Sequence, residues 1–583
     1  MQWDLSPLYR GFDDPALLAD FQRGEDWSLE DREFFAAGLP VDGERLYQAV
    51  RRLERMANLC NALEHYLLLT LAVDATNEPA LALRDRLLRL LTESQLSRSA
   101  FARLAGEAGD LETLLSGDER LAPCAFFIRE AAARQEHLLE PSLEDAVLRM
   151  QVTGSRAWEQ LRDLLDGTAL VELDGRQIPL SAARNLAYSP DAATRRRAYE
   201  AELAAYPAFE GPMAACLNGI KGEALTLSEW ERFGDPLEAT LFASRMDRQT
   251  LDAMWTAIAE YAPKFRQYLR AKARLLGHDN GLPFYDLFAP IGEGHKRFTL
   301  EQAQAYLVEV LGRFNPRMAA FVDQAFRQRW IDAEPRPGKQ GGAFCADIHS
   351  RGVSRILDNF EGSFSDVLTL AHELGHGYHN LCMQSLSILN TDVPMPLAET
   401  ASIFNETLVL QDALANAGEG ERLALLEAEL MEVNQVILDI YSRYLFETEV
   451  FRRRRQRALP AAELKELMLD AQRQAYGDGL DPQYLHPYMW ACKSHYYSPD
   501  VHFYNFPYAF GQLFGRGVYA VYRREGQAFL PAYDGMLARG GRDTVANVAG
   551  LMGADVRDPA FWCGSLASYG EEIDEYLRLA VRV

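Results

Sequence analysis

Residues 369–379 read TLAHELGHGYH and place two histidines and a glutamate in the pattern H-E-x-x-H. On a helix, His372 and His376 lie one turn apart on the same face, with about 5–6 Å between their Cβ atoms. Two imidazoles at that spacing can both reach one tetrahedral ion, at about 2.0–2.1 Å from each ring nitrogen. Glu373 leaves this pair at an angle and can hold a water molecule on the ion without binding the ion itself. The pattern therefore predicts a hydrolytic metal site.

A solvated, histidine-rich helix is the alternative to a metal site. Five residues leave both interpretations open, because a catalytic zinc usually takes a third protein ligand as well as water. His379 lies near the same stripe, seven residues after His372. We interpret His379 as a packing histidine or as one that lies behind the ligands, because a third imidazole from one helix does not easily converge with the first two.

The segment MPLAETASIFNETLV (395–409) offers the third ligand. Pro396 suits the first turn of a new helix, and Glu399 and Glu406, seven residues apart, would then share one face of it. Either glutamate can face the first helix across an antiparallel pair. Glu399 follows His372 by 27 residues, which leaves room for a loop and a return. Glu406 can instead orient a ligand imidazole through its second ring nitrogen.

Exposed helix glutamates are the alternative for this pair. Their neighbours argue against it because they are apolar and indicate a buried helix, in which a carboxylate needs a partner; these neighbours are Leu397, Ala398, Ile403 and Phe404.

Most of the chain that must position these residues reads as helix. Apolar residues recur at three- and four-residue spacing from Asp42 to about Leu115. Further amphipathic segments lie at 143–167, 191–207, 249–276 and 300–330. The residues before His372 also favour a helix, with Ser365 as its N-cap.

Strand patterns are few. ALVELDGRQIPL (169–180) alternates about an Asp174-Gly175 turn and predicts a hairpin, and residues 341–348 and 352–360 predict a second pair of strands. A chain of 583 residues is too long for one ordinary core. We expect a mainly α fold with a small β-sheet, divided into an N-terminal helical domain (1–200) and a catalytic domain (201–583).

Composition and charge argue against several classes of protein, among them nucleic-acid-binding, secreted and membrane proteins. The formal charge of −24 argues against nucleic acid as a partner, since phosphate contacts need a basic surface. The seven cysteines are scattered, odd in number and without a CxxC pair, a pattern typical of free thiols in a reducing compartment. No signal peptide is visible at the N-terminus, and apolar runs such as 66–73 are far shorter than the ~20 residues of a membrane span. We therefore expect a soluble cytoplasmic protein without a membrane partner.

Several segments carry a resemblance to a known family. They occur in one order along nearly the whole chain: WDLSPLY (3–9), TGSRAW (153–158), LNGIKGE (217–223), GGAFC (341–345), HELGHGYH (372–379), LAETASIFNE (397–406) and FYNFPYAFG (503–511). Together they resemble the zinc oligopeptidases of the thimet oligopeptidase and oligoendopeptidase F family, and oligoendopeptidase F more closely.

This resemblance implies two helical lobes that enclose a deep channel, with one zinc ion at its floor and a small β-sheet near the ion. It also implies an endopeptidase that cleaves internal bonds of short oligopeptides, because a narrow channel excludes folded proteins. His372, His376 and Glu399 are by resemblance the zinc ligands. The resemblance also implies that Glu373 is the base, which takes a proton from the attacking water and delivers it to the leaving amine.

The segment 490–517 is rich in donors for the oxyanion that amide hydrolysis creates. A tightly packed aromatic core is the alternative, and we assign it to Tyr496 and Tyr497. In the family, a histidine and tyrosines of this segment line the cleft and bind the tetrahedral intermediate. By resemblance these are His495, Tyr504 and Tyr508. His502 competes with His495, which we favour because it follows the tryptophan segment as the family pattern does.

GGAFCADI (341–348) can either form a structural hairpin or offer a strand edge to which a substrate peptide adds. Cys345 within it is interpreted as a packing residue.

Two other functions remain open. A carboxypeptidase or dipeptidyl-carboxypeptidase would need a dedicated site for the substrate's free carboxylate, which the sequence does not identify. A metal-stabilised scaffold that binds peptides without cutting them would have no use for Glu373, and structural zinc sites are usually closed and rich in cysteine.

Overall fold

The computed structural model describes residues 1–292 and 297–581. Its N-terminal part is helical, as the amphipathic pattern from Asp42 onward predicts. Asp42 caps the second helix by accepting a hydrogen bond from the backbone N–H of Arg45. The helices of this part are α1 (Pro15–Ala36), α2 (Gly43–Val73), α3 (Glu78–Gly106), α4 (Leu111–Gly117), α5 (Ala125–Gln135), α6 (Pro141–Thr153) and α7 (Ser155–Thr168).

The predicted hairpin follows α7. Strands β1 (Leu170–Leu173) and β2 (Arg176–Pro179) pair antiparallel about Asp174 and Gly175. Both turn residues have positive φ, 50° and 74°, which is the requirement of a two-residue type I′ turn and explains the Asp-Gly pair. This prediction is confirmed.

The rest of the chain is also mainly helical. A π-helical stretch, Gln435–Asp439, joins two of these helices. They are α8 (Leu180–Asn185), α9 (Ala192–Ala205), α10 (Glu210–Trp230), α11 (Pro236–Ala243), α12 (Arg248–Leu275), α13 (Leu300–Phe314), α14 (Pro316–Arg327), α15 (Phe364–Met383), α16 (Met395–Ala398), α17 (Thr400–Asn416), α18 (Glu419–Asn434), α19 (Ile440–Arg454), α20 (Ala461–Tyr476), α21 (Met489–Cys492), α22 (Phe506–Glu525), α23 (Leu530–Arg539), α24 (Val545–Gly550) and α25 (Pro559–Ala580).

A three-stranded sheet lies against α15. Its strands are β3 (Ile331–Asp332), β4 (Phe344–Ile348) and β5 (Val353–Leu357), in the order β3-β5-β4. β4 and β5 pair antiparallel, as predicted. β3 joins β5 in parallel and was not expected, because two residues are too few to show the alternation of a strand.

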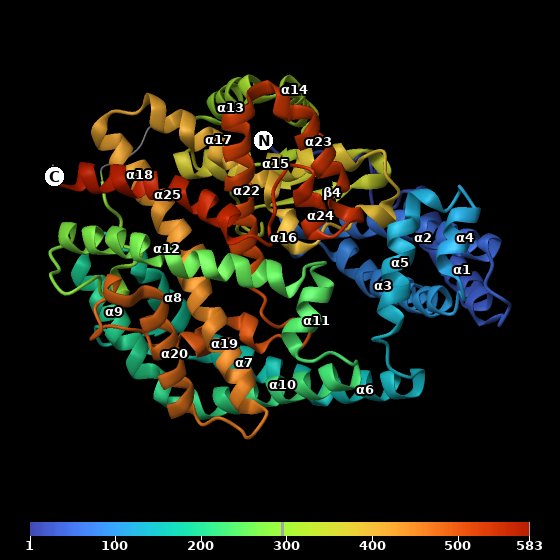
Figure 1. Ribbon diagram of the computed structural model, residues 1–583, viewed down its shortest axis with the longest axis horizontal. Helices are drawn as coiled ribbons and strands as arrows, with labels where there is room; N and C mark the ends of the chain where they lie inside the picture. The colour runs from blue at the N-terminus through green and yellow to red at the C-terminus, as the bar shows by residue number, and fades with distance from the viewer. Residues whose placement is uncertain (293–296, 582–583) are drawn as a thin grey trace.

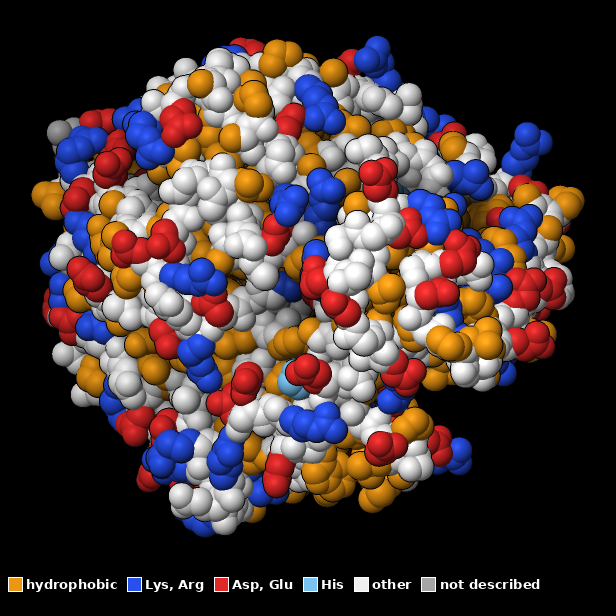
Figure 2. Space-filling model, turned by 45° about the vertical axis from the view of Figure 1, so that its right-hand side comes forward, with side chains coloured by type: hydrophobic (Ala, Val, Ile, Leu, Met, Phe, Trp, Pro, Cys, Tyr) orange, Lys and Arg blue, Asp and Glu red, His pale blue; other side chains and the backbone are white. Residues whose placement is uncertain are grey.

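The helices form two halves around α12, which is green in Figure 1. Helices α13 to α17 and α22 lie above it, α9, α10, α19 and α20 lie below it, and the N-terminal helices α1 to α5 lie at one end. The surface is hollowed between the upper and lower halves (Figure 2). The fold is therefore mainly α, with helical lobes around a cleft and a small sheet, as expected.

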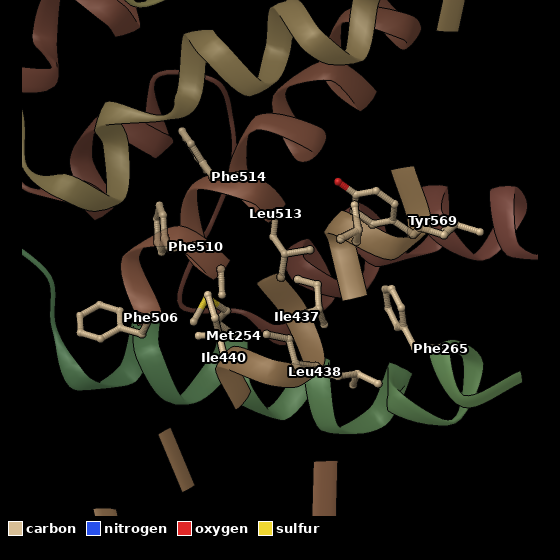
Figure 3. Packing of buried hydrophobic residues seen from close by; sticks show 14 of the residues in the cluster. Met254, Phe265, Ile437, Leu438, Ile440, Phe506, Phe510, Leu513, Phe514 and Tyr569 are labelled. Carbon is tan, nitrogen blue, oxygen red and sulfur yellow. The ribbon is translucent and has the colours of Figure 1, made fainter. Parts of the chain in front are cut away.

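The largest hydrophobic core runs from Ala169 to Leu579 and joins both halves. Figure 3 shows side chains of α22, among them Phe510 and Leu513, gathered with Met254 of α12 and Ile437 of the π-helical stretch. Two smaller cores hold the N-terminal helices. The division into domains at residue 200 stays a prediction. No described helix has the length and apolarity that a membrane span requires.

Two of the sequence segments that carry the resemblance pack against each other. The side chain of Glu223 on α10 accepts hydrogen bonds from the backbone N–H and the hydroxyl of Ser155, at 3.0 and 2.5 Å. A Cβ at Gly219 would lie 2.6 Å from the indole nitrogen of Trp158. TGSRAW and LNGIKGE thus hold α7 against α10.

Candidate metal centre

Helix α15 carries H-E-x-x-H, and its N-cap lies two residues before the expected position. Its N-cap is Ser363 and not Ser365: the Ser363 hydroxyl accepts from the Asp366 N–H at 3.1 Å, and the Asp366 carboxylate accepts from the Ser363 N–H at 3.0 Å. This reciprocal pair satisfies two N–H groups at the helix start, which a serine inside the first turn cannot do. The N-cap prediction was wrong by two residues.

The two histidines of α15 and a distant glutamate converge on one point. The Nε2 atoms of His372 and His376 lie 3.1 Å apart, and the Oε2 atom of Glu399 lies 3.2 and 3.5 Å from them. These three residues form one of the two described groups that could hold a metal ion. An ion at about 2.0–2.1 Å from each ligand in a tetrahedron has ligands about 3.3–3.4 Å apart, so these atoms fit a single zinc-sized cation.

Glu399 lies at a break between two helices. We expected Glu399 and Glu406 on one face of a single helix, but α16 ends at Ala398 and α17 begins at Thr400. Pro396 occupies the first turn of α16, as predicted. The break turns the Glu399 carboxylate toward the histidines, and the Ser402 hydroxyl donates to its Oε2 atom at 3.0 Å.

Glycines allow the close approach of the helices that meet here. A Cβ at Gly375 would lie 2.6 Å from the carbonyl oxygen of Ala401, so α15 and α17 touch at this point. A Cβ at Gly511 would lie 2.8 Å from the Cβ of Glu399, so α22 passes directly beside the third candidate ligand. The sequence showed these glycines, but not which helices they bring together.

Glu406 contacts the far side of the first histidine. The Nδ1 atom of His372 lies 3.0 Å from Glu406 Oε1, an arrangement in which Nδ1–H donates and the Nε2 lone pair faces the other two ligands. Burial lowers the pKa of His372, but Glu406 and Glu399 raise it well above its usual value. The neighbouring Asn405 donates to the carbonyl of Ala371 at 3.2 Å and anchors α17 to α15.

The sequence reasoning did not single out Ser402 and Asn405. Both are polar and buried in an apolar helix, which is the signal that could have found them.

Glu373 is buried, with 6% of the residue exposed, and lies close enough to His372, His376 and Glu399 to interact with their charges. Its Oε2 atom has no hydrogen-bond partner among the residues that the structure describes. Burial raises the pKa of Glu373, and the two histidines oppose this rise. A buried carboxylate oxygen without a partner costs free energy unless water or a ligand reaches it, which suits a group that handles a proton.

His379 lies outside the convergent group. It is buried, and its Nε2 atom lies 3.1 Å from the carbonyl oxygen of Leu537. Burial lowers the pKa of His379 to about 4, and His376 adds to this effect, so the ring is neutral near pH 7. Its position agrees with a packing histidine.

The predicted oxyanion donors lie together at the start of α22. The hydroxyl oxygens of Tyr504 and Tyr508 are 2.9 Å apart, and the ring of His495 stacks on Tyr504 at 5.2 Å between centroids. Burial raises the pKa of Tyr508, and Tyr504 and Glu399 raise it further, so its hydroxyl stays protonated. Burial lowers the pKa of His495 to about 4, with smaller contributions from Arg443 and Lys493.

His502, the alternative to His495, contacts other residues. His502 is buried, with its Nδ1 atom 3.3 Å from the ammonium of Lys221, which in turn is paired with Glu447 at 2.6 Å. Tyr496 and Tyr497 are each 1% exposed and belong to the core, as expected. The geometry favours His495 over His502 as the partner of the tyrosines.

Known proteins were compared with this chain. The sequence pattern described as peptidase family M3 matches residues 185–568, and the one described as oligopeptidase F matches residues 104–168. The chain belongs to peptidase family M3.

Two oligopeptidases resemble this M3 peptidase over most of their length. The group B oligopeptidase PepB of Streptococcus agalactiae is 23% identical over 78% of this chain and 76% of its own length. Oligopeptidase PepF of Bacillus subtilis is 22% identical over 94% of this chain and 82% of its own.

Two solved structures share the fold of this M3 peptidase. A putative peptidase from Chlamydophila abortus matches with a TM-score of 0.83 and 20% identity, covering 99% of this chain and 98% of its own. Oligoendopeptidase-F from Enterococcus faecium matches with a TM-score of 0.71 and 17% identity, covering 96% and 99%.

Proposed function

We propose that this M3 peptidase is a zinc-dependent endopeptidase that hydrolyses internal bonds of short oligopeptides. The observation that carries the proposal is the convergence of two imidazole nitrogens and one carboxylate oxygen within 3.1–3.5 Å of each other. A set of two histidines and one glutamate is typical of catalytic zinc and leaves a fourth position for water or substrate. The names of the related oligopeptidases support peptides as the substrate class.

In this proposal His372, His376 and Glu399 hold one zinc ion, and Glu406 fixes the ring of His372. When bound, zinc lowers the pKa of a water molecule toward ~7 and polarises a carbonyl group.

Glu373 is proposed as the general base. Its Oε2 atom, which has no partner among the described residues, accepts a proton from the attacking water and later delivers it to the leaving amine. The pKa raised by burial makes this carboxylate a stronger base than an exposed one, which improves the first transfer.

His495, Tyr504 and Tyr508 are proposed as donors to the carbonyl oxygen when it gains negative charge. The contact between the two hydroxyls means that one of them donates to the other, which orients the pair before substrate arrives. Stacking on Tyr504 holds the His495 ring beside them.

The outer edge of β4 is proposed to bind the substrate backbone. Ile356 of β5 donates its backbone N–H to the carbonyl oxygen of Trp330, on the β3 side of the sheet. The residues directly before and after Ile356 therefore form the hydrogen bonds to β4. Cys345 of β4 therefore turns its N–H and C=O away from the sheet, whereas the carbonyl of Asp347 accepts from Asn61 at 3.0 Å. A peptide adding at Cys345 would gain main-chain hydrogen bonds that ignore its side chains.

The compartment and the domain division are part of the same proposal. All seven cysteines are free thiols, which fits a reducing compartment such as the cytoplasm. We propose residues 1–200 as a helical domain that covers the catalytic residues of 201–583.

The test is digestion of a quenched-fluorescence peptide blocked at both ends, with and without a chelator. Cleavage that the chelator abolishes and added zinc restores supports a metal-dependent endopeptidase. Cleavage only of peptides with a free C-terminus would favour a carboxypeptidase. Binding of peptide with one zinc per chain but without turnover would refute catalysis.

A further inference from the structure

A cavity of about 380 Å³ lies beside the predicted oxyanion donors. Tyr504 forms part of its wall, and so does Met395 of α16, the short helix that ends at Ala398, directly before Glu399. Other parts of the wall come from the end of α10, from α11 and from the rest of the loop that leads into α22. A peptide held at the proposed site would therefore place one of its side chains near this cavity.

Most of the wall is apolar, and most of its polar side chains are already satisfied. The hydroxyl of Thr240 donates to the carbonyl oxygen of His502 at 2.8 Å, and that of Ser228 donates to the carbonyl of Ala224 at 2.8 Å. The Gln151 amide donates to Glu223 at 3.1 Å. These groups have little hydrogen bonding to offer a ligand.

Glu231 differs from them. It follows directly after α10, is half-buried and lines the cavity. Its carboxylate receives no hydrogen bond or ion pair from any residue in the described ranges, while its backbone carbonyl accepts from the ring of His137. Burial raises the pKa of the Glu231 carboxyl, His137 lowers it and Glu144 raises it. The cavity wall thus includes a residue whose carboxylate has no hydrogen-bond or ion-pair partner in the described part of the chain.

The charged side chains of the cavity wall are all acidic among the described residues. Asp500 is a second acidic residue, exposed and paired with Arg156 at 2.9 Å. No lysine or arginine is among the described residues that line the cavity. His502 stays neutral because burial, and secondarily the ammonium of Lys221, lowers its pKa well below its usual value.

We propose that this cavity is a subsite for a lysine or arginine side chain of the substrate, whose cationic end pairs with Glu231. The walls suit such a side chain because its methylene stem is apolar and covers apolar surface, while its charged head needs a carboxylate. The net charge of −24 favours the same class of peptide through long-range attraction. The inference rests on the proposed function, because the occupant is a residue of the substrate.

The test uses blocked, quenched peptides that differ at one position, occupied by lysine, arginine, norleucine or glutamate. Four proteins are compared by kcat/KM: the wild type, Glu231→Gln, Glu231→Lys and the control Glu229→Gln. Glu229 is an exposed residue of α10, two positions earlier, and does not line the cavity. Cleavage of the norleucine peptide checks that each variant is folded.

We expect the wild type to prefer lysine or arginine at one fixed position from the cut. Glu231→Gln should lower kcat/KM for the lysine peptide about 10-fold, equivalent to about 1.4 kcal/mol, and leave the norleucine peptide unchanged, because only a charged side chain pairs with the carboxylate. Glu231→Lys should favour glutamate at that position, and Glu229→Gln should behave as the wild type.

The proposal is overturned if the wild type cuts peptides without a basic preference at any position, or if Glu231→Gln keeps that preference. Both outcomes leave the proposed function standing. Failure of the wild type to cut any blocked peptide would instead overturn the proposed function and this subsite together.

Discussion

Replacement of His379 by glutamine tests whether a histidine next to the candidate metal centre is held neutral. Burial, with a smaller effect of His376, lowers the pKa of His379 from 6.5 to about 4. The unfolded chain binds a proton here below about pH 6.5, whereas the folded chain resists it. The stabilisation is therefore complete above pH 6.5 and is lost as the pH falls toward 4.

The magnitude follows from these two pKa values. Between pH 7 and pH 5 the unfolded imidazole becomes almost fully protonated and the folded one stays mostly neutral. Linkage then gives a loss of about 2 kcal/mol in the free energy of unfolding from this one residue. His379→Gln removes the titration and keeps an N–H that can reach the carbonyl oxygen of Leu537.

The assay is urea unfolding of both proteins at pH 7 and pH 5, followed by circular dichroism. A chelator is present throughout, because metal binding is itself pH-dependent. We expect the variant to lose about 2 kcal/mol less than the wild type on acidification. Other titrating groups, such as His502, act equally in both proteins and cancel. Equal losses in the two proteins would refute the reasoning that His379 is buried and neutral.

Four substitutions test the candidate metal centre. Glu373→Gln should keep bound zinc, measured by elemental analysis, and lose at least about 100-fold in peptide turnover, because the base is gone. His376→Ala should lose both zinc and turnover. Glu406→Gln should weaken zinc affinity by about 10–100-fold in competition with a chelating dye, since His372 loses its orienting carboxylate. Gly375→Ala should lower the free energy of unfolding by about 1–3 kcal/mol in a denaturant titration, because its Cβ would meet the facing helix at 2.6 Å.

Each of these expectations has an outcome that contradicts it. Zinc retained by His376→Ala would mean that this imidazole is not a ligand. Turnover at the parent rate in Glu373→Gln would mean that another group is the base. Unchanged zinc affinity in Glu406→Gln would mean that the contact with His372 is incidental. A Gly375→Ala protein as stable as the wild type would show that α15 and α17 can separate without cost.

Local patterns predicted the helices and the two antiparallel strand pairs of this chain. The Asp174-Gly175 hairpin and the helix that carries His372 depend on neighbours within a few residues, which a sequence displays directly. The N-cap of α15 shows where prediction from local pattern fails. Two serines lie two residues apart at the start of this helix, Ser363 before it and Ser365 within its first turn, and only the reciprocal bonds between Ser363 and Asp366 decide between them.

Features that depend on distant residues could not be predicted. The parallel pairing of β3 needs β5 beside it, and the pattern of a two-residue strand carries no information. The choice between His495 and His502 depends on Lys221, which lies 281 residues before His502 and reaches its ring only in the folded chain. Spacing within the segment 490–517 therefore left both histidines open.

The two glutamates of the second helix pair show why spacing alone was insufficient at the centre itself. On one continuous helix Glu399 and Glu406 compete for the same role, because seven residues place them on one face. The chain instead breaks at Glu399, and the two carboxylates reach opposite nitrogens of one imidazole, Nε2 and Nδ1 of His372. In the proposed zinc site the two carboxylates are thus not alternatives: Glu406 would fix the ring orientation in which Glu399 and both histidines hold one cation, so we expect loss of either carboxylate to weaken zinc binding.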